Sequence, residues 1–143
     1  MSAAVRYTTS LEGITARDLA GGYWVGWPTP PTPDQHLALL QGSEVVVLAI
    51  DDGTGRVVGF VTAIGDGVLA AYLPLLEVLP AWQGQGIGSE LVRRVLAELD
   101  PRYMVDLVCD EDLVPFYERL GFTPYRGMLR RDRSAIERSR GSG

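Results

Sequence analysis

The stretch AWQGQGIGSE, residues 81–90, places glycine at three alternate positions directly after a run of apolar residues. Gly84, Gly86 and Gly88 each forgo a side chain, and glycine costs conformational entropy on folding. Three residues without side chains between a predicted strand and a predicted helix indicate that another group approaches the backbone amides closely. A helix that begins there exposes unpaired N–H groups and the positive end of its dipole, which together bind phosphate. Taken alone, the three glycines are explained about as well by a tight turn between the strand and the helix as by a phosphate site.

The residues after these glycines predict an amphipathic helix that Pro101 ends. Its apolar residues recur at helical spacing and form one face: Ile87, Leu91, Val92, Val95, Leu96 and Leu99. Upstream, two runs rich in β-branched residues, 44–52 and 56–64, are joined by Asp-Gly-Thr-Gly, which is typical of a β-hairpin. A long strand is expected over residues 68–79.

The second half of the chain predicts two further strands and a helix. Residues 102–109 are expected to be a strand, and residues 126–131 an edge strand. Between them, DEDLVPFYERLGF, residues 110–122, predicts a helix with Asp112 as its N-cap and Gly121 at its end. This order of elements predicts an α/β (α+β) fold: a mixed, mostly antiparallel central sheet with helices on both faces.

Length and charge indicate one acidic domain. The 143 residues carry a formal net charge of -5, but residues 130–143 hold five arginines against two acidic residues. That leaves 8 basic and 16 acidic residues in 1–129, a net charge of -8, which would repel nucleic acid and attract a cationic small molecule. We expect a single domain over residues 1–130 and a disordered basic tail over 131–143.

The chain has one cysteine, Cys109, and one histidine, His36. These counts exclude an internal disulfide and a Cys/His metal site, so no metal is expected. Cys109 is expected to be a small buried residue and His36 to lie at the surface. No apolar run is long enough to span a membrane and no leader pattern is present, so we expect a cytoplasmic protein with no membrane partner.

Two common phosphate-binding motifs do not fit the glycine stretch. The dinucleotide fingerprint G-x-G-x-x-G, counted from Gly84, requires glycine where this chain has Ser89. A Walker A loop requires lysine, and the chain contains none.

The sequence QGQGIG, residues 83–88, resembles the Q/R-x-x-G-x-G/A signature of the GNAT superfamily of acyl-CoA N-acyltransferases. The longer stretch LLEVLPAWQGQGIGSELV, residues 75–92, resembles that family's strand-loop-helix motif. PFYERLGF, residues 115–122, resembles its late-helix motif, in which a tyrosine precedes Leu-Gly-Phe. The resemblance covers residues 3 to about 130 and implies the GNAT fold.

The resemblance implies acetyl-CoA as the cofactor. The loop 83–89 would hold the pyrophosphate through Gln83, Gly84, Gln85, Gly86, Ile87, Gly88 and Ser89. The outer edge of the long strand, at Leu76, Glu77 and Val78, would bind the pantetheine arm and the thioester carbonyl. Unpaired strand amides can accept an extended ligand as they would an added strand.

The resemblance also places Tyr117 near the sulfur as the proton donor to the leaving thiolate; packing of the helix on the sheet is the alternative role for this residue. Some family members carry a glutamate six residues before the position of Val78, where this chain has Tyr72. Glu77 and Asp106 interrupt apolar strands and are the candidate bases, with an ordered water as a third. We take Tyr117 and Glu77 as the catalytic candidates.

Trp24 and Trp27 lie in the segment that lines the acceptor side in this family. Aromatic faces suit a cationic or aromatic amine, although packing of a proline-rich loop explains them equally well. Trp24, Trp27, Tyr72 and Asp106 are the candidate substrate-binding residues.

The predicted function is transfer of an acetyl group from acetyl-CoA to a primary amine, directly, within a ternary complex. The acceptor would be a small-molecule or peptide amine, and exposed sheet edges favour a homodimer. One alternative is a catalytically degenerate domain that binds CoA as a sensor or interaction module. Another is a nucleotide-binding domain of a different kind.

Overall fold

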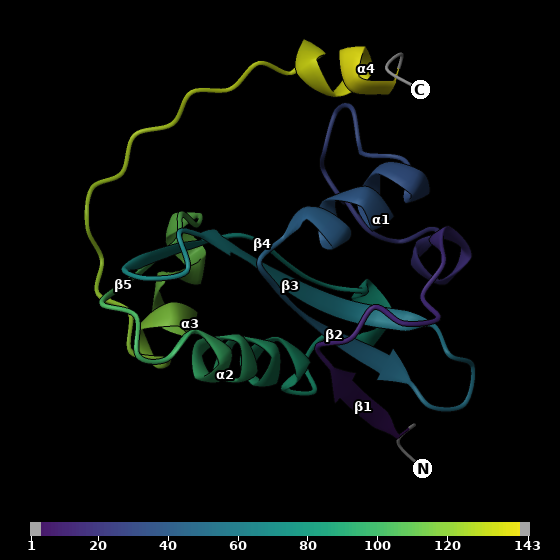
Figure 1. Cartoon of the computed structure of the whole chain (residues 1–143), viewed down its shortest axis with the longest axis horizontal. Coiled ribbons are helices and arrows are strands. Elements are labelled where there is room, and N and C mark those ends of the chain that lie inside the picture. The colour runs from purple at the N-terminus through teal and green to yellow at the C-terminus, as the bar shows by residue number, and fades with distance from the viewer. Residues whose placement is uncertain (1–3, 141–143) are drawn as a thin grey trace.

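The computed structural model describes residues 4–140 and is built around a five-stranded sheet in the order β1-β2-β3-β4-β5 (Figure 1). β1, β2, β3 and β4 pair antiparallel to one another in that order, and β5 runs parallel to β4. The strands are β1 (Val5–Thr8), β2 (Val45–Asp51), β3 (Val57–Gly65), β4 (Ala70–Val78) and β5 (Met104–Asp106). The predicted hairpin and the long strand after it are thus confirmed.

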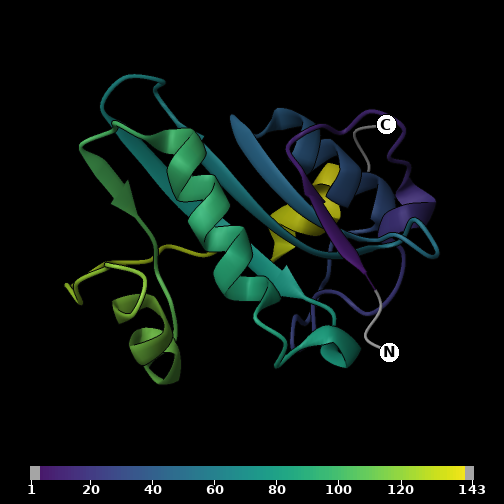
Figure 2. The same ribbon diagram turned by 90° about the horizontal axis from the view of Figure 1, so that it is seen from below.

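Helices cover both faces of this sheet. Helix α2 lies diagonally across one face, and α1 lies on the other (Figure 2). The helices are α1 (Pro33–Gly42), α2 (Ile87–Leu99), α3 (Val114–Glu118) and α4 (Ser134–Arg140), with short 3-10 turns η1 (Ala16–Leu19), η2 (Pro80–Trp82) and η3 (Glu111–Leu113). The predicted fold class is therefore confirmed.

The core forms where the middle strands are buried on both faces. β2 and β3 supply most of it, because nearly all their residues are apolar and more than half are β-branched. On one side, Leu91 and Val95 of α2 are fully buried against the sheet, as the helical periodicity predicts. Gly59 of β3 makes the close approach of α2 possible: a Cβ there would lie 3.2 Å from both the Glu77 carbonyl oxygen and the Leu91 side chain.

The opposite face of the sheet buries an aromatic cluster that contains His36. The expectation that His36 lies at the surface is wrong: its side chain is fully buried. Its ring centroid lies 4.5 Å from that of Phe60, 4.9 Å from Trp24 and 5.2 Å from Tyr23. Burial lowers the pKa of His36 to about 4, so the ring is neutral at pH 7. His36 faces inward because it shares a helix face with Leu40, four residues on.

The segments after α2 differ from the sequence prediction. β5 spans three residues rather than the expected strand over 102–109, because the chain turns away from β4 after Asp106. The helix expected between Asp112 and Gly121 is preceded by η3 and becomes α-helical only at Val114, so Asp112 is not its N-cap. The helix ends at Glu118, and Gly121 lies beyond it in a turn with φ 96°.

The C-terminal residues also differ. No strand forms over 126–131; these residues are exposed and lie in an extended segment. The tail expected to be disordered contains α4, which lies beside α1 because the Gln35 side chain of α1 donates to Ile136 and Ser139. Residues 141–143 of the expected tail lie outside the described residues. Within residues 4–140, every helix is too short or too polar to cross a lipid bilayer.

We expect His36 to make the stability of the fold sensitive to mild acid. The unfolded chain binds a proton near pH 6.5 and the folded chain only near 4, so stability is complete above about 6.5 and falls as pH drops toward 4. The free energy of unfolding of the wild type should fall by about 3 kcal/mol more than that of His36→Phe over this range. Urea unfolding at several pH values measures this difference, and parallel pH profiles would contradict it.

Two glycines at the start of α2, Gly86 and Gly88, should respond differently to replacement by alanine. Gly86 is the N-cap of α2 at φ 84°, a region that costs an alanine about 1–2 kcal/mol. Gly88 lies inside the helix, and a Cβ there would meet Phe116 at an ordinary 3.6 Å. Urea unfolding should therefore give a loss of about 1 kcal/mol for Gly86→Ala and no loss for Gly88→Ala. Equal losses of unfolding free energy in the two variants would mean that the left-handed conformation of Gly86 does not affect stability.

Candidate functional site

The outer edge of β4 is open over its second half. β5 pairs with β4 only at Ala70, Ala71 and Tyr72. Beyond Asp106 the chain leaves the sheet and continues into η3 and α3 (Figure 1). The last residues of β4 are accordingly half-buried rather than buried. The two parallel strands thus diverge and leave one side of β4 without a strand neighbour.

The hydrogen-bond pattern tells which groups face this opening. The Leu79 N–H donates to the Val58 carbonyl at 2.9 Å, and Val78 lies opposite Gly59 in the register. Because an antiparallel ladder alternates, Val78 and Leu76 direct their N–H and C=O groups away from β3 and toward the opening. The Val78 carbonyl is occupied by the Gln83 side-chain amide at 3.0 Å. The N–H groups of Leu76 and Val78 remain available to a ligand.

The glycine-rich loop supplies a second set of free donors. Within the described part of the chain, the backbone N–H groups from Gly84 to Ser89 donate to no protein acceptor, and the first helical bond is Glu90 N–H to Gly86 O at 3.1 Å. A Cβ at Gly84 or Gly86 would meet no atom within 4 Å, so open space adjoins both residues. These donors lie at the N-terminus of a 13-residue helix, where the dipole favours an anion.

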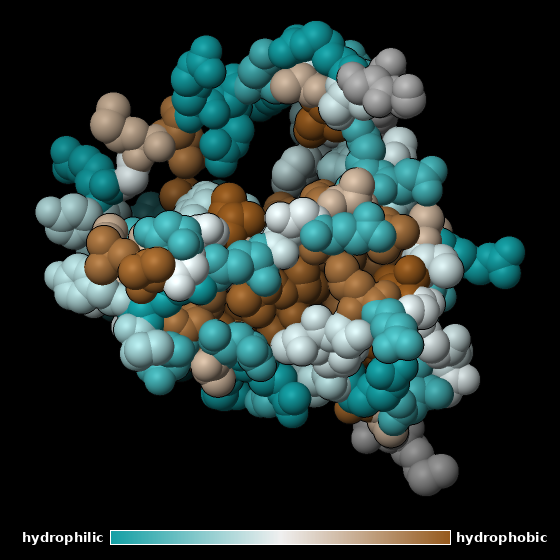
Figure 3. Space-filling model, viewed as in Figure 1, coloured by the Kyte–Doolittle hydropathy of each residue, from teal (hydrophilic) through white to brown (hydrophobic). Residues whose placement is uncertain are grey.

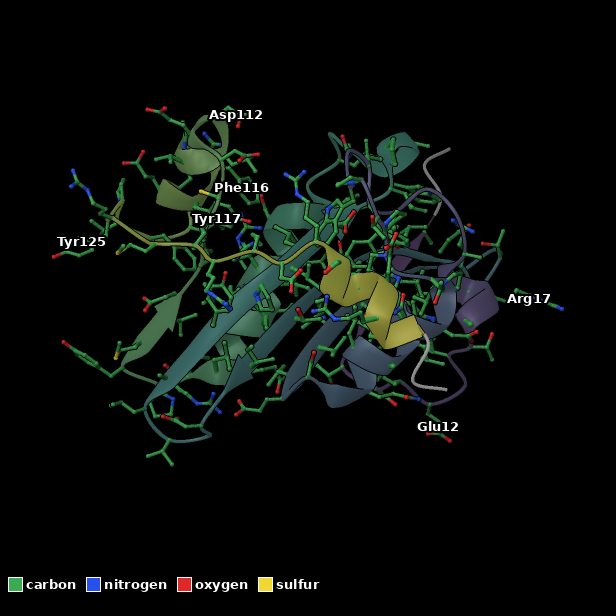
Figure 4. All side chains as sticks on the ribbon, turned by 90° about the horizontal axis from the view of Figure 1, so that it is seen from above. Glu12, Arg17, Asp112, Phe116, Tyr117 and Tyr125 are labelled. Carbon is green, nitrogen blue, oxygen red and sulfur yellow. The ribbon has the colours of Figure 1, made fainter. Side chains whose placement is uncertain are left out.

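Helix α3 carries the predicted acid, Tyr117, toward this region. The neighbouring Phe116 contacts the start of α2 at Gly88, and the Tyr117 ring packs at 4.9 Å from Phe116 and 5.7 Å from Phe122 (Figure 4). Burial, and secondarily the nearby Cys109, raise the pKa of Tyr117 to about 12. The hydroxyl is therefore protonated throughout the neutral pH range.

Tyr117 opens onto a cleft of about 700 Å³. Tyr72 and Asp106, adjacent partners of the β4–β5 pair, line the same cleft, as does Cys109. Cys109 was expected to be buried and is half-buried instead, because β5 has ended before it. The structure thus brings together the predicted acid and two of the predicted substrate-binding residues.

Glu77 lies on the other face of the sheet, beside the α1 cluster. It stands opposite Phe60 in the register, and its Oε1 accepts a hydrogen bond from the Trp24 N–H at 2.9 Å. Its Oε2 is buried and has no hydrogen-bond partner within the described residues. Desolvation raises the pKa of Glu77 and the Trp24 N–H partly opposes this, so the carboxylate accepts a proton more readily than a free glutamate.

The two tryptophans predicted to bind substrate meet edge to face, with their ring centroids 5.1 Å apart. Trp24 is 7% exposed and packs against His36, so packing accounts for most of its surface. Trp27 is 42% exposed and presents a free aromatic face. Trp24 also adopts φ 67°, a conformation uncommon for a large side chain and typical of strained positions near functional sites.

The predicted residues therefore form two groups rather than one. Tyr117, Tyr72 and Asp106 share the cleft, whereas Glu77, Trp24 and Trp27 gather on the α1 face. No hydrogen bond in residues 4–140 joins Glu77 to Tyr117. The sequence reasoning missed the buried polar groups His36 and Thr62, which neighbour this second group on the α1 face. The four-residue spacing of His36 and Leu40, which places both on one face of α1, is the sequence signal that could have predicted the burial of His36.

Comparison with known proteins agrees with this geometry. The family model for the acetyltransferase (GNAT) domain matches residues 41–124. A serotonin N-acetyltransferase 2 from Oryza sativa subsp. japonica, described as chloroplastic, is 37% identical over 87 residues, which cover 58% of this chain and 44% of that protein. This chain spans about half the length of the curated relatives it matches.

Two solved structures share the architecture. The crystal structure of a candidate acetyltransferase from Deinococcus radiodurans R1 is 51% identical, with a TM-score of 0.87 over 91% of this chain and 90% of that one. Aminoglycoside N-acetyltransferase AAC(6')-Iy, solved in complex with CoA, is 17% identical, with a TM-score of 0.64 over 93% of this chain and 97% of its own, and shows the fold alone. The open β4 edge and the glycine loop are thus features of a chain that belongs to the GNAT acetyltransferase family.

Proposed function

We propose that this protein transfers an acetyl group from acetyl-CoA to a primary amine, directly, within a ternary complex. The observation that carries the proposal is the run of free backbone N–H groups from Gly84 to Ser89 at the start of α2. A diphosphate is the ligand that such a cradle of donors and a helix dipole fit best.

The residues present suit coenzyme A along its length. The loop offers donors and open space for the pyrophosphate, and the opening beside β4 offers the N–H groups of Leu76 and Val78. The pantetheine arm contains two amides and is extended, so it can pair with such an edge as an added strand does. The CoA complex of the aminoglycoside N-acetyltransferase, which shares the fold, supports this choice of cofactor.

Bound acetyl-CoA would supply an acetyl group activated as a thioester. The Val78 N–H, directed into the opening, would polarise the thioester carbonyl and stabilise the negative charge that develops on its oxygen. Tyr117 would donate its hydroxyl proton to the departing sulfur. The pKa of Tyr117, raised to about 12, keeps that proton on the hydroxyl at neutral pH, so the hydroxyl is available to donate a hydrogen bond to the sulfur.

Glu77 is our candidate for the base that accepts the amine proton. Its buried, unpartnered Oε2 and its raised pKa are properties of a general base rather than of a surface carboxylate. Trp27, on the same face, offers an aromatic surface to the acceptor. The relative named serotonin N-acetyltransferase supports an acceptor that combines an aromatic group with a primary amine. The net charge of -8 over residues 1–129 would attract its ammonium form.

Replacing Tyr117 with phenylalanine tests the proposed reaction. Calorimetric titration should give the same CoA affinity for both proteins, since the hydroxyl does not contact the pyrophosphate loop. Acetyl transfer to a panel of arylalkylamines, polyamines and peptide amines should fall about 10²–10⁴-fold in kcat in the variant, the usual contribution of a general acid. Tyr103→Phe, which removes the hydroxyl of an 83% exposed tyrosine that does not line the cleft, is the matched control and should keep full activity.

The possible failures of this experiment have distinct meanings. Absence of heat with millimolar CoA would refute the cofactor assignment. CoA binding without transfer to any amine would indicate a binding module instead of an enzyme. Unchanged kcat in Tyr117→Phe would remove the acid role and leave the remaining assignments intact.

The pH profile tests Glu77 separately. If Glu77 must be deprotonated to act, kcat/KM should rise with pH through its pKa, which lies above the ordinary 4.5. Glu77→Gln keeps an oxygen that can accept the Trp24 N–H but cannot take a proton, so kcat/KM should fall about 10²–10⁴-fold and the acid limb should disappear. Asp106→Asn, which changes the other candidate base, should retain that limb. An unchanged acid limb in Glu77→Gln would exclude Glu77 as the base.

A further inference from the structure

The segment between η1 and α1 brings a backbone N–H group against Glu77. Residues 21–27, here called the tryptophan loop, include Trp24, whose φ of 67° is the one positive value at a non-glycine residue within residues 4–140. A bulky side chain is rare in this conformation, which persists only where the surrounding contacts impose it. The tryptophan loop must therefore be held in place by its neighbours.

The backbone just before Trp24 is fixed from two sides. The Tyr23 hydroxyl donates to the Val57 carbonyl at the start of β3, with 2.6 Å between the oxygens. Gly22 adopts φ 89°, and a Cβ there would lie 2.9 Å from the Leu79 side chain, just beyond the end of β4. The tryptophan loop is thus anchored to both strands that flank the Glu77 side chain.

The Trp24 indole is held by other rings. Its ring centroid lies 4.9 Å from that of His36, 5.1 Å from Trp27 and 5.9 Å from Phe60. His36 is fully buried, and neither ring nitrogen has a hydrogen-bond partner within the described residues. Burial of a polar ring without partners costs free energy, so what His36 contributes here is the shape of its ring.

The hydrogen bond from Trp24 gives the two oxygens of Glu77 different surroundings. Oε1 accepts the Trp24 N–H at 2.9 Å, whereas Oε2 is buried and has no partner in the part of the chain that the structure describes. In the space-filling view apolar side chains gather along the middle of the molecule, where the sheet lies between α1 and α2 (Figure 3). A carboxylate among apolar neighbours that is bound through one oxygen has the direction of the other oxygen fixed.

The charged and titratable groups around Glu77 leave this bond to orient it. None of the ion pairs formed within residues 4–140 includes Glu77. β3 presents Phe60 opposite it, and α1 presents His36, which is neutral at pH 7. Burial, only partly offset by the Arg56 charge, raises the pKa of Tyr23 above its ordinary value, so that hydroxyl is uncharged too.

We propose that Trp24 and His36 are positioning residues for acetyl transfer, a role that rests on Glu77 being the base proposed above. The Trp24 N–H holds Oε1, so Oε2 is the atom that takes the proton. As it does, an N–H bond of the amine breaks, the electron pair stays on nitrogen and an O–H bond forms at Oε2. The His36 ring keeps the Trp24 backbone in the conformation that presents its N–H to Glu77.

Nuclear magnetic resonance on the full chain without acetyl-CoA tests the hydrogen bond apart from catalysis. The Trp24 amide proton should shift as Glu77 titrates, since a carboxylate accepts a stronger hydrogen bond than a neutral acid. Glu77→Gln, which keeps His36 but cannot titrate, should lose this response. His36→Ala should lose it as well, because the indole is no longer held. His36→Phe, which keeps an aromatic ring at this position, should restore it.

Kinetics tests whether this orientation serves the reaction. In His36→Ala, kcat for acetyl transfer should fall about 10–100-fold, as expected for a misplaced catalytic group, while KM for acetyl-CoA stays unchanged. Val95→Ala removes a fully buried side chain of α2 on the opposite face of the sheet and is the matched control for lost core packing. It should keep both kcat and the response of the Trp24 amide.

Three results would overturn the proposal. The first is a Trp24 amide that does not respond to Glu77 in the wild type or still responds in His36→Ala. The second is a failure of His36→Phe to restore the response, because the shape of the ring is the property invoked. The third is an unchanged kcat in His36→Ala after the response is lost. In that case kcat of Glu77→Gln separates the two proposals: a fall retains Glu77 as the base, and no change refutes that assignment as well.

Discussion

The geometry of this protein depends on the divergence of β5 from β4. The two strands pair over Ala70–Tyr72 and Met104–Asp106 and then separate. The N–H groups that Leu76 and Val78 direct into this opening would be paired by the proposed ligand, which would complete the sheet as an added strand does. The same divergence makes β5 short and leaves its outer edge open. One departure from regular pairing thus generates the proposed ligand edge.

Glu77 connects this edge to the aromatic cluster on the α1 face. Burial of a carboxylate with one unpartnered oxygen is unfavourable, and so is a tryptophan at φ 67°. The hydrogen bond from Trp24 to Glu77 joins these two unfavourable features. The buried, neutral His36 packs on the same tryptophan and fixes its ring. Unfavourable features that support one another are typical of sites under functional constraint, because a fold selected for stability alone would replace them with apolar packing.

Local patterns predicted those parts of the structure that local forces determine. The helix after Gly86 and the hairpin of β2 and β3 follow from residue periodicity and turn chemistry, and both were predicted with small errors at their ends. The short β5 and α4 were not predicted correctly, because each depends on residues distant in the sequence: β5 on β4, and α4 on Gln35. The burial of His36 was missed although its spacing with Leu40 on one helix face indicated it. The grouping of Glu77 with Trp24, apart from Tyr117, likewise follows from the alternation of side chains across β4, and strand register cannot be derived from composition.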